Sequence, residues 1–592
     1  MVPKFSLFSV IKNKKILLLS LVLILGIFLR FYKISDLPYP LNGDEKAFGY
    51  YAWSISHFGS DEYGNKLPFY FPSIGDYKYP VYTYLSAPLS YIFGLNPILP
   101  RLISSIASIL LIITVYKFSF LLFKSSKIAL ISAILVTISP WNITFSRTAS
   151  EANLMTFLSF LGFYFFYKFL VNKKNETKLL FYSGILFLIS FFTYSASRVF
   201  IPIMILFLLL FLIFTKNYQK IKPTLLFFVF TVILVLLSFI SPSSRVRANN
   251  LSILPNFQTR YEWINQSTYT LGLGNPTNPL ITRLFFNKAT AFFKEFTNRY
   301  ISHFSFNYLF LTGDIVKLNS IPNFGNFYVF EIIFFILGIS TLVNKIFKKD
   351  LASFLIFSGI VISPIAASTT IETPSAVRQL VGLPYLILAI SLGLNFLLKK
   401  SKLSLMVIIL FYVYFFLFLL LSVFKIKPYA QPWTTDQGNQ ELVKIIWSLK
   451  DNYKYIFVPN DPYIDFLFYN KITPKDFLSN AKIEEEKTGK WNRVSQLQNI
   501  IFNVDSNCPK TGQKNALYVC TGEEISPFAH IVDVINYSDN IPHYVLIDFP
   551  GGDQTQQIAP AQIKYILPKD MDQRWPSGIF TNPNQYYLNL IL

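Results

Sequence analysis

Charged residues are scarce in this chain of 592 residues: they make up 14% of it, while hydrophobic residues make up 52%. A soluble domain carries roughly 25% charged residues. Many apolar runs of this chain reach the ~17–25 residues that a helix needs to cross a bilayer. The composition therefore excludes a soluble globular protein and predicts a mainly α, polytopic membrane protein.

Cysteine and histidine are also rare, with 2 and 4 residues in the whole chain. This scarcity excludes a Cys/His metal cluster. We predict no metal site and no cofactor, although the composition does not exclude a divalent metal. Both cysteines, Cys508 and Cys520, lie near the C-terminus. We expect that region to face an oxidising compartment, which is consistent with a local disulfide between them.

Acidic residues are outnumbered, so that the net charge is +21. A soluble protein this basic would suggest nucleic-acid binding. Here the positive residues fall in short clusters between the apolar runs, which is the pattern of cytoplasmic loops. We therefore predict that these positive residues lie beside membrane lipids, and we predict no nucleic-acid partner.

About eleven spans account for the apolar runs. We expect them at residues 16–32, 98–122, 127–141, 152–171, 178–194, 199–215, 222–240, 326–344, 351–368, 378–398 and 403–424. The run 81–95 is short and contains Pro88, so it is better placed as an interfacial or re-entrant helix. The first span leads into Arg30 and Lys33 without a small-residue cleavage site, which predicts an anchor and no cleaved signal peptide.

The charges of the loops predict the orientation. The loops assigned to the inside carry 19 Lys and Arg residues against 2 acids, whereas residues 33–80 carry 4 against 6. This asymmetry places the N-terminus in the cytoplasm and the C-terminus outside the cell membrane.

Two domains follow from this arrangement. Residues 1–424 form the membrane domain, with a first outer loop at 33–97 and a large outer loop at 242–325. Residues 425–592 form an exterior domain. Its helical pattern at 439–450 and its apolar segments at 454–459, 516–520 and 543–548 predict a small α/β fold.

The outward loops hold the candidate site residues, because ionisable groups beside lipid are costly and usually functional. Asp44 and Glu45 follow Gly43, and a helix is expected at 47–57. They either stabilise the N-terminus of that helix or form a carboxylate base whose pKa is raised by desolvation.

Cations in the same loops have similar alternatives. Lys78 either meets a phosphate at headgroup depth or snorkels to the interface. Arg101 pairs with Asp44 or Glu45, or binds a lipid phosphate. Arg147 and Glu151 stand four residues apart, which favours a pair within one helix. The remaining candidates are Arg198, Asp314 and Arg378.

The order of these motifs resembles the GT-C glycosyltransferases, specifically the protein O-mannosyltransferases and lipid A aminoarabinose transferases. The resemblance covers roughly residues 15–400. It rests on Gly43-Asp44-Glu45, Tyr77-Lys78-Tyr79-Pro80-Val81-Tyr82, Pro100-Arg101-Leu102-Ile103-Ser104, Ser139-Pro140 with Arg147, and His303-Phe304-Ser305 through Leu311-Thr312-Gly313-Asp314.

The resemblance implies the GT-C fold and an inverting transfer of a hexose or pentose from a polyprenyl-phosphate sugar. The acceptor would be a hydroxyl of a lipid, glycan or protein on the outer face. Asp44 would be the catalytic base with Glu45 beside it. Lys78, Arg101 and Arg378 would hold the donor phosphate. Arg147, Glu151, Arg198 and Asp314 would support them.

The chain departs from the patterns of these families in three respects. Lys46-Ala47-Phe48 replaces the run typical of aminoarabinose transferases, no MIR-type insert is evident, and the first loop lacks the Asp-x-Asp of metal-dependent oligosaccharyltransferases. Two other classes stay open. One is a lipid-linked glycan polymerase or ligase using the arginines of 242–325, and the other is a polytopic lipid or sugar transporter. The exterior domain is expected to recognise the acceptor or cover the site, with Asp461, Asp465 and Asp548 as ordinary loop or strand-end acids.

Overall fold

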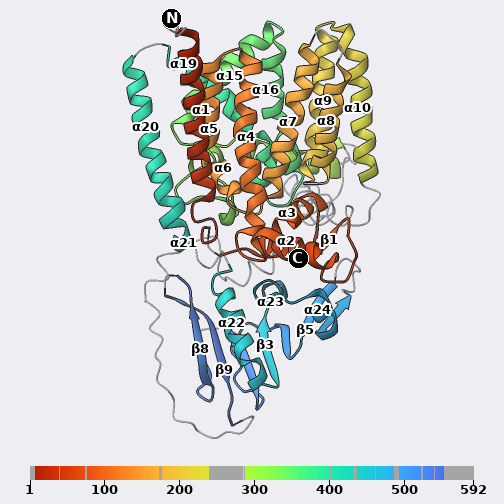
Figure 1. Cartoon of the computed structure of the whole chain (residues 1–592), viewed down its shortest axis with the longest axis vertical. Coiled ribbons are helices and arrows are strands. Elements are labelled where there is room, and N and C mark those ends of the chain that lie inside the picture. Colours follow the sequence, from red (N-terminus) through yellow and green to blue (C-terminus); the bar gives the residue numbers. More distant parts are fainter. Residues whose placement is uncertain are drawn as a thin grey trace, which may run out of the picture.

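The chain folds into a helical bundle and a C-terminal domain built on a β-sheet, joined at one end of the bundle (Figure 1). This computed structural model describes residues 7–38, 40–73, 76–172, 176–238, 284–285, 287–399, 402–430, 436–460, 462–485, 492–521, 525–538 and 540–551. The predicted fold class, a mainly α membrane protein with a C-terminal α/β domain, is confirmed.

Helices lie at all eleven positions expected for spans. They are α1 (Leu7–Phe31), α4 (Leu99–Phe123), α5 (Ser126–Ile138), α7 (Glu151–Val171), α8 (Thr177–Phe191), α9 (Ala196–Phe214), α10 (Tyr218–Ser238), α15 (Glu331–Phe347), α16 (Leu351–Ile362), α19 (Leu383–Leu397) and α20 (Lys402–Leu421). By length and composition, 7 helices among the described residues could cross a membrane, or 8 if the bent pair of α5 and α6 (Pro140–Ser146) is one span. The count of eleven spans and their orientation stay predictions.

Glycine lets two central helices of the bundle touch through their backbones. A Cβ atom at Gly338 in α15 would lie 2.0 Å from the carbonyl oxygen of Ala389, and one at Gly393 in α19 would lie 1.9 Å from that of Phe334. Small residues at helix contacts allow this close approach in membrane bundles. Both glycines therefore set the spacing between α15 and α19.

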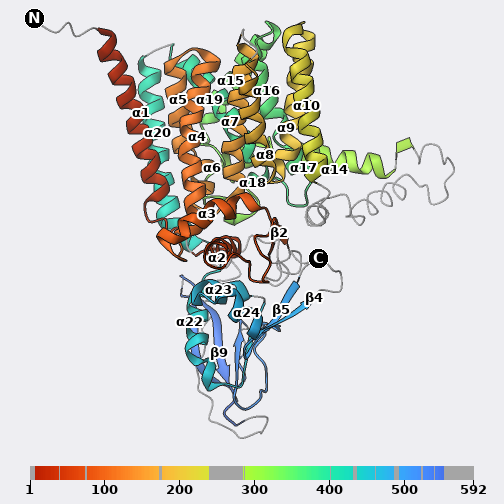
Figure 2. The ribbon, with the colours of Figure 1, turned by 45° about the vertical axis from the view of Figure 1, so that its right-hand side comes forward.

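The end of the bundle that faces the C-terminal domain carries the first outer loop (Figure 2). It contains α2 (Gly43–Phe58), the antiparallel strands β1 (Phe71–Ser73) and β2 (Asp76–Lys78), and α3 (Pro80–Phe93). The helix expected at 81–95 is confirmed as α3. The expected start of α2 at 47 is wrong, because Asn42 caps a helix that begins at Gly43 and the Glu45 side chain completes a capping box.

Shorter helices connect the rest of this end. They are α14 (Lys288–Ser302), η1 (Asn307–Leu311), η2 (Lys317–Asn319), α17 (Ile365–Ser368), α18 (Ala376–Gln379), η3 (Leu380–Gly382), η4 (Ser422–Ile426) and α21 (Lys427–Ala430). Most of the large outer loop, residues 239–283, lies outside the described residues.

The C-terminal domain has a mixed seven-stranded sheet in the order β4-β5-β6-β3-β7-β9-β8. The strand β3 pairs in parallel with β6 and β7, and the other pairs are antiparallel. The predicted segments are confirmed as the helix α22 (Asn439–Leu449) and the strands β3 (Tyr455–Pro459), β7 (Ala516–Cys520) and β9 (Pro542–Asp548). Not predicted were α23 (Tyr463–Asn470), α24 (Pro474–Asn480), β4 (Ala481–Glu485), β5 (Asn492–Leu497), β6 (Ile500–Val504) and β8 (His530–Asn536).

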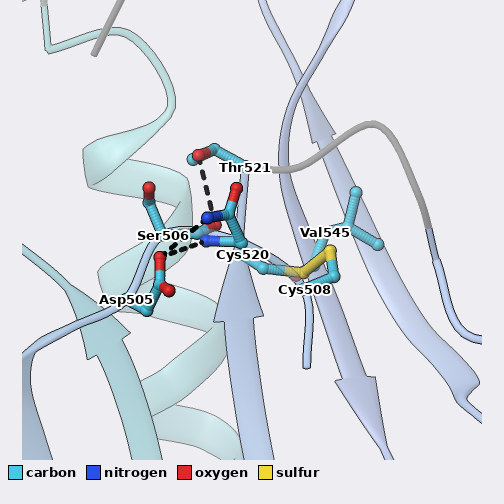
Figure 3. The surroundings of a disulfide bond; sticks show 7 residues. Asp505, Ser506, Cys508, Cys520, Thr521 and Val545 are labelled. Carbon is cyan, nitrogen blue, oxygen red and sulfur yellow. Dashed lines mark hydrogen bonds between the residues drawn. A yellow bond between two sulfur atoms is a disulfide. The ribbon is translucent and has the colours of Figure 1, made fainter. Parts of the chain in front are cut away.

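A disulfide joins Cys508 to Cys520, with their Cα atoms 5.0 Å apart (Figure 3). It ties the loop after β6 to the end of β7, next to Val545 of β9. The amide of Thr521 donates to the carbonyl of Ser506 beside it, at 2.8 Å. The expected pairing of the two cysteines is confirmed.

Candidate active site

Asp44 and Lys78 form an ion pair between α2 and the end of β2. The Nζ atom of Lys78 lies 2.8 Å from Oδ1 of Asp44. The Lys78 side chain is 7% exposed, whereas that of Asp44 is 63% exposed. The protein itself therefore leaves this carboxylate open to an approaching molecule.

Glu45, the next residue of α2, is turned into the protein and fully engaged. Its two oxygens accept from Arg101 Nε at 2.8 Å and Arg101 Nη2 at 3.1 Å. They also accept from the backbone amides of Asn42 and Ala149, at 3.1 and 3.2 Å. These four hydrogen bonds fix the position of the Glu45 carboxylate.

Arg101 is bound by protein acceptors through each of its three nitrogens. Besides Glu45, it donates to the carbonyl oxygens of Ile34 and Pro38, both at 2.7 Å. The sequence left two alternatives for Arg101, an acid partner or a lipid phosphate. The structure shows the acid partner, which fixes α2 against α4 and the end of α1.

Lys46 completes the first turn of α2 with a contact that the sequence did not predict. Its ammonium is buried between Asp465, at the start of α23, and Asp436, which lies 2.7 Å away. Burial alone would lower the pKa of Lys46, but the two carboxylates outweigh this effect and raise it. The expectation that Asp465 is an ordinary loop or strand-end acid is wrong, because it lies in α23 and is buried against α2.

Arg147 and Arg198 lie near this end of the bundle with different partners. Arg147 follows α6 and donates to the carbonyls of Leu29 and Tyr32, at 2.6 and 2.8 Å. The expected pair with Glu151 within one helix is wrong, because the chain breaks between α6 and α7, and Glu151 begins α7. Arg198 stacks over the ring of Tyr79, next to Lys78, at 4.5 Å.

Asp314 and Arg378 belong to a second cluster, with His303 and Glu372. Arg378 pairs with Glu372 at 3.2 Å, and Asp314 accepts from the amides of Ala376 and Val316, at 2.6 and 2.8 Å. Burial raises the pKa of Asp314 to about 6. The candidate residues therefore divide into one group around α2 and one around α18.

No group of three or more His, Cys, Asp or Glu residues suited to a metal ion occurs among the residues that the structure describes. Near the site, the two acids of α2 each form an ion pair with a cation: Asp44 with Lys78, and Glu45 with Arg101. The arrangement can therefore hold a negatively charged group beside Lys78 and offers the Asp44 carboxylate as a proton acceptor.

A family model described as dolichyl-phosphate-mannose-protein mannosyltransferase matches residues 77–242. This match confirms the resemblance to membrane glycosyltransferases with lipid-linked donors over a stretch that includes Lys78, Arg101, Arg147 and Arg198. A search of curated proteins gives no match.

The chain is also similar to several solved structures. One is ArnT from Cupriavidus metallidurans bound to undecaprenyl phosphate, with 10% identity, a TM-score of 0.48, and coverage of 92% of this chain and 99% of that chain. Another is the oligosaccharyltransferase AglB from Archaeoglobus fulgidus in complex with an inhibitory peptide and a dolichol-phosphate, with 14% identity and a TM-score of 0.46. That match covers 78% of this chain but only 64% of AglB. At these TM-scores the similarities carry no residue correspondence.

Proposed function

We propose that this protein is an inverting glycosyltransferase that moves a sugar from a polyprenyl-phosphate donor to an acceptor hydroxyl at the outer face of the cell membrane. The observation that carries the proposal is the pair of Asp44 and Lys78. It combines an exposed carboxylate with a buried ammonium at 2.8 Å, at the end of the bundle. The family match over residues 77–242 supports the reaction class.

In the proposed reaction, Asp44 is the general base. It accepts the proton of the acceptor hydroxyl while the hydroxyl oxygen forms a bond to the anomeric carbon of the sugar. The bond from that carbon to the phosphate oxygen breaks, and polyprenyl phosphate leaves with the electron pair. Lys78 stabilises the negative charge on the departing phosphate, and its move toward that phosphate frees the Asp44 carboxylate for the proton.

Glu45 and Arg101 have a positioning role in this proposal. The four hydrogen bonds to Glu45 leave it no open face for an acceptor. The nitrogens of Arg101 are likewise occupied by protein oxygens. Their ion pair fixes the first turn of α2 and so directs Asp44 toward Lys78.

The test measures sugar transfer from radiolabelled polyprenyl-phosphate sugars by the purified protein in the presence of acceptor membranes. Asp44→Asn should lower the rate by about 10²–10⁴-fold without unfolding the protein. Asp36→Asn is the matched control, because Asp36 is an exposed acid of the same loop, and it should keep its rate. Full turnover by Asp44→Asn would remove Asp44 from the role of base.

The second candidate function, a lipid-linked glycan polymerase or ligase, gains no support from the described part of the large outer loop. Arg299 is the described member of its arginine set. It pairs with Glu295 at 2.7 Å and donates to the carbonyls of Thr370 and Ile371. These contacts hold α14 against the segment before α18, which is a structural role.

A further inference from the structure

The helix α14 projects sideways from the bundle. Figure 2 shows it running across the direction of the spans and out beyond the edge of the bundle, at the level at which α10 ends. Its last turns are docked on the bundle. There Tyr300 donates to the carbonyl of Val361 at 2.8 Å. Arg299 donates to the carbonyls of Thr370 and Ile371, both at 2.7 Å. The rest of the helix extends away from these contacts.

The sequence of α14 divides the helix lengthwise into two halves, because residues four apart share one row along a helix. One uncharged row is aromatic and consists of Phe292, Phe296 and Tyr300. Its rings stack with centroids 6.2 and 6.1 Å apart. The adjacent uncharged row consists of Phe293, Thr297 and Ile301. The polar half of the helix includes Lys294, Glu295, Asn298 and Arg299.

The row of Phe293, Thr297 and Ile301 is open. Phe293 is 70% exposed and Ile301 is 60% exposed, so that no described part of the chain covers them. Thr297, between them, is exposed as well. Large apolar side chains that are exposed together on one face indicate a partner that the chain itself does not supply.

The position of α14 identifies this partner as the lipid bilayer. Only 17% of the apolar window of α10 is buried in the protein, so most of its surface faces lipid. A helix that leaves the bundle at the level at which α10 ends lies over the surface of that lipid (Figure 2). Amphipathic helices with basic residues on one face and phenylalanine on the other lie in the plane of the membrane interface.

We propose that α14 is an in-plane membrane anchor, with its row of Phe293, Thr297 and Ile301 placed in the membrane–water interface. The exposed polar row beside it, which contains Lys294 and Asn298, then faces water. The inference goes beyond the proposed function and does not depend on it.

The anchor has a consequence for the second cluster of charged residues. Besides the two carbonyls bound by Arg299, the segment before α18 is held by His303 at the end of α14. Its Nε2 atom accepts from the amide of Ser375 at 3.1 Å. Arg378 follows three residues later, in α18. Insertion of α14 into the interface therefore fixes the depth of this segment relative to the lipid surface.

The experiment places spin labels on the full-length protein in nanodiscs of zwitterionic lipid. The two native cysteines are joined in a disulfide, so a single introduced cysteine carries the label. Phe293→Cys and Thr297→Cys report on the uncharged row, and Asn298→Cys is the matched control on the polar row. Leu410→Cys gives the reference for a label in lipid, because Leu410 is a 60% exposed residue of α20.

Each label is tested for collisions with oxygen, which concentrates in lipid, and with a water-soluble nickel complex. Labels at Phe293 and Thr297 should collide mainly with oxygen, as the label at Leu410 does, whereas the label at Asn298 should collide mainly with nickel. Equal access of nickel to all three positions of α14 would place the row in water and overturn the inference. Protection of Phe293 and Thr297 from both reagents would mean that a protein covers the row, which would also overturn it.

A second measurement tests whether the apolar side chains cause the insertion. With the label at Thr297, the double variant Phe293→Ser with Ile301→Ser should shift the ratio of oxygen to nickel collisions toward the ratio found at Asn298. The control is Asn298→Ser, a polar replacement on the polar row, which should leave the ratio unchanged. An unchanged ratio in the double variant would overturn the inference. None of these readouts requires sugar transfer, so the anchor can fail while the proposed function stands, and the reverse.

Discussion

Replacing Lys46 by methionine should loosen the contact between α2 and the C-terminal domain. The substitution keeps much of the side-chain volume but removes the ammonium between Asp436 and Asp465. The Asp465 side chain is 4% exposed and would be left as a buried carboxylate without its counter-ion, whereas Asp436 is 31% exposed and can be solvated. Breaking a buried pair in this way costs about 3–5 kcal/mol.

The free-energy cost of the lost ion pair has an upper limit, because the Asp465 carboxyl can take up a proton instead of staying charged without its partner. An ordinary Asp has a pKa of about 3.9, so protonation at pH 7 costs roughly 4 kcal/mol at 1.36 kcal/mol per unit. We therefore expect about 3–4 kcal/mol at pH 7 and less at lower pH, because protonation of Asp465 then becomes easier.

Hydrogen exchange of the backbone amides in α2 and α23 measures this loss as an opening free energy. A loss of 3–4 kcal/mol corresponds to exchange about 10²–10³-fold faster in Lys46→Met. The double variant Lys46→Met with Asp465→Leu should recover most of the loss, because a buried pair replaced by apolar groups is often neutral. Lys475→Met, an exposed change in α24, is the control. Unchanged exchange in Lys46→Met would refute the reasoning.

Two other substitutions test the fold around the site. Burial raises the pKa of Glu62 well above its ordinary value, so the folded protein holds a proton that the unfolded chain releases. Stability should therefore fall as pH rises above the ordinary glutamate pKa of about 4.3 toward the raised pKa of the folded protein. Glu62→Gln should reduce this slope in pH-dependent thermal unfolding, while Glu441→Gln, an exposed change in α22, should not. Gly393→Ala should cost about 1–3 kcal/mol of stability through its clash with Phe334. The control is Gly184→Ala, whose Cβ would meet its nearest atom at 3.4 Å; equal melting of the two would contradict the close packing.

The bundle was predictable because bilayer thickness fixes the length of an apolar run. Each of the eleven expected segments contains a helix for that reason. The number of helices that cross the membrane could not be predicted in the same way, because α8 and α15 are shorter than α4, and α5 bends by 56° into α6. Hydropathy locates such helices without stating whether a short or bent one completes a span.

Strands of the C-terminal domain were predictable only where both faces are covered. The central strands β3, β7 and β9 are largely buried and read as apolar runs. In contrast, β8 has only one buried residue among its seven, and β4 and β5 are polar strands at the other edge. Edge strands carry polar residues that avoid pairing with other chains, so their sequences resemble loops.

The start of α2 could have been predicted from its capping signal. Asn42 followed three residues later by Glu45 is a capping box, which marks the first turn of a helix. The partner of Lys46 could not have been predicted in the same way. Asp465 is 419 residues away in the chain, and only the docked C-terminal domain brings the two together.

Consecutive helix positions explain why three neighbouring charged residues have three separate partners. Each step along an α-helix turns the side chain by roughly 100°. Asp44 therefore meets Lys78 at the open side, Glu45 turns into the bundle toward Arg101, and Lys46 turns toward Asp465 of the C-terminal domain. The sequence alone does not distinguish Asp44 from Glu45 as a candidate base. The rotation of the helix does, because it leaves only Asp44 exposed. Because the same turn of helix is held by the bundle on one side and by the C-terminal domain on another, a shift of that domain on acceptor binding would move Asp44 relative to Lys78.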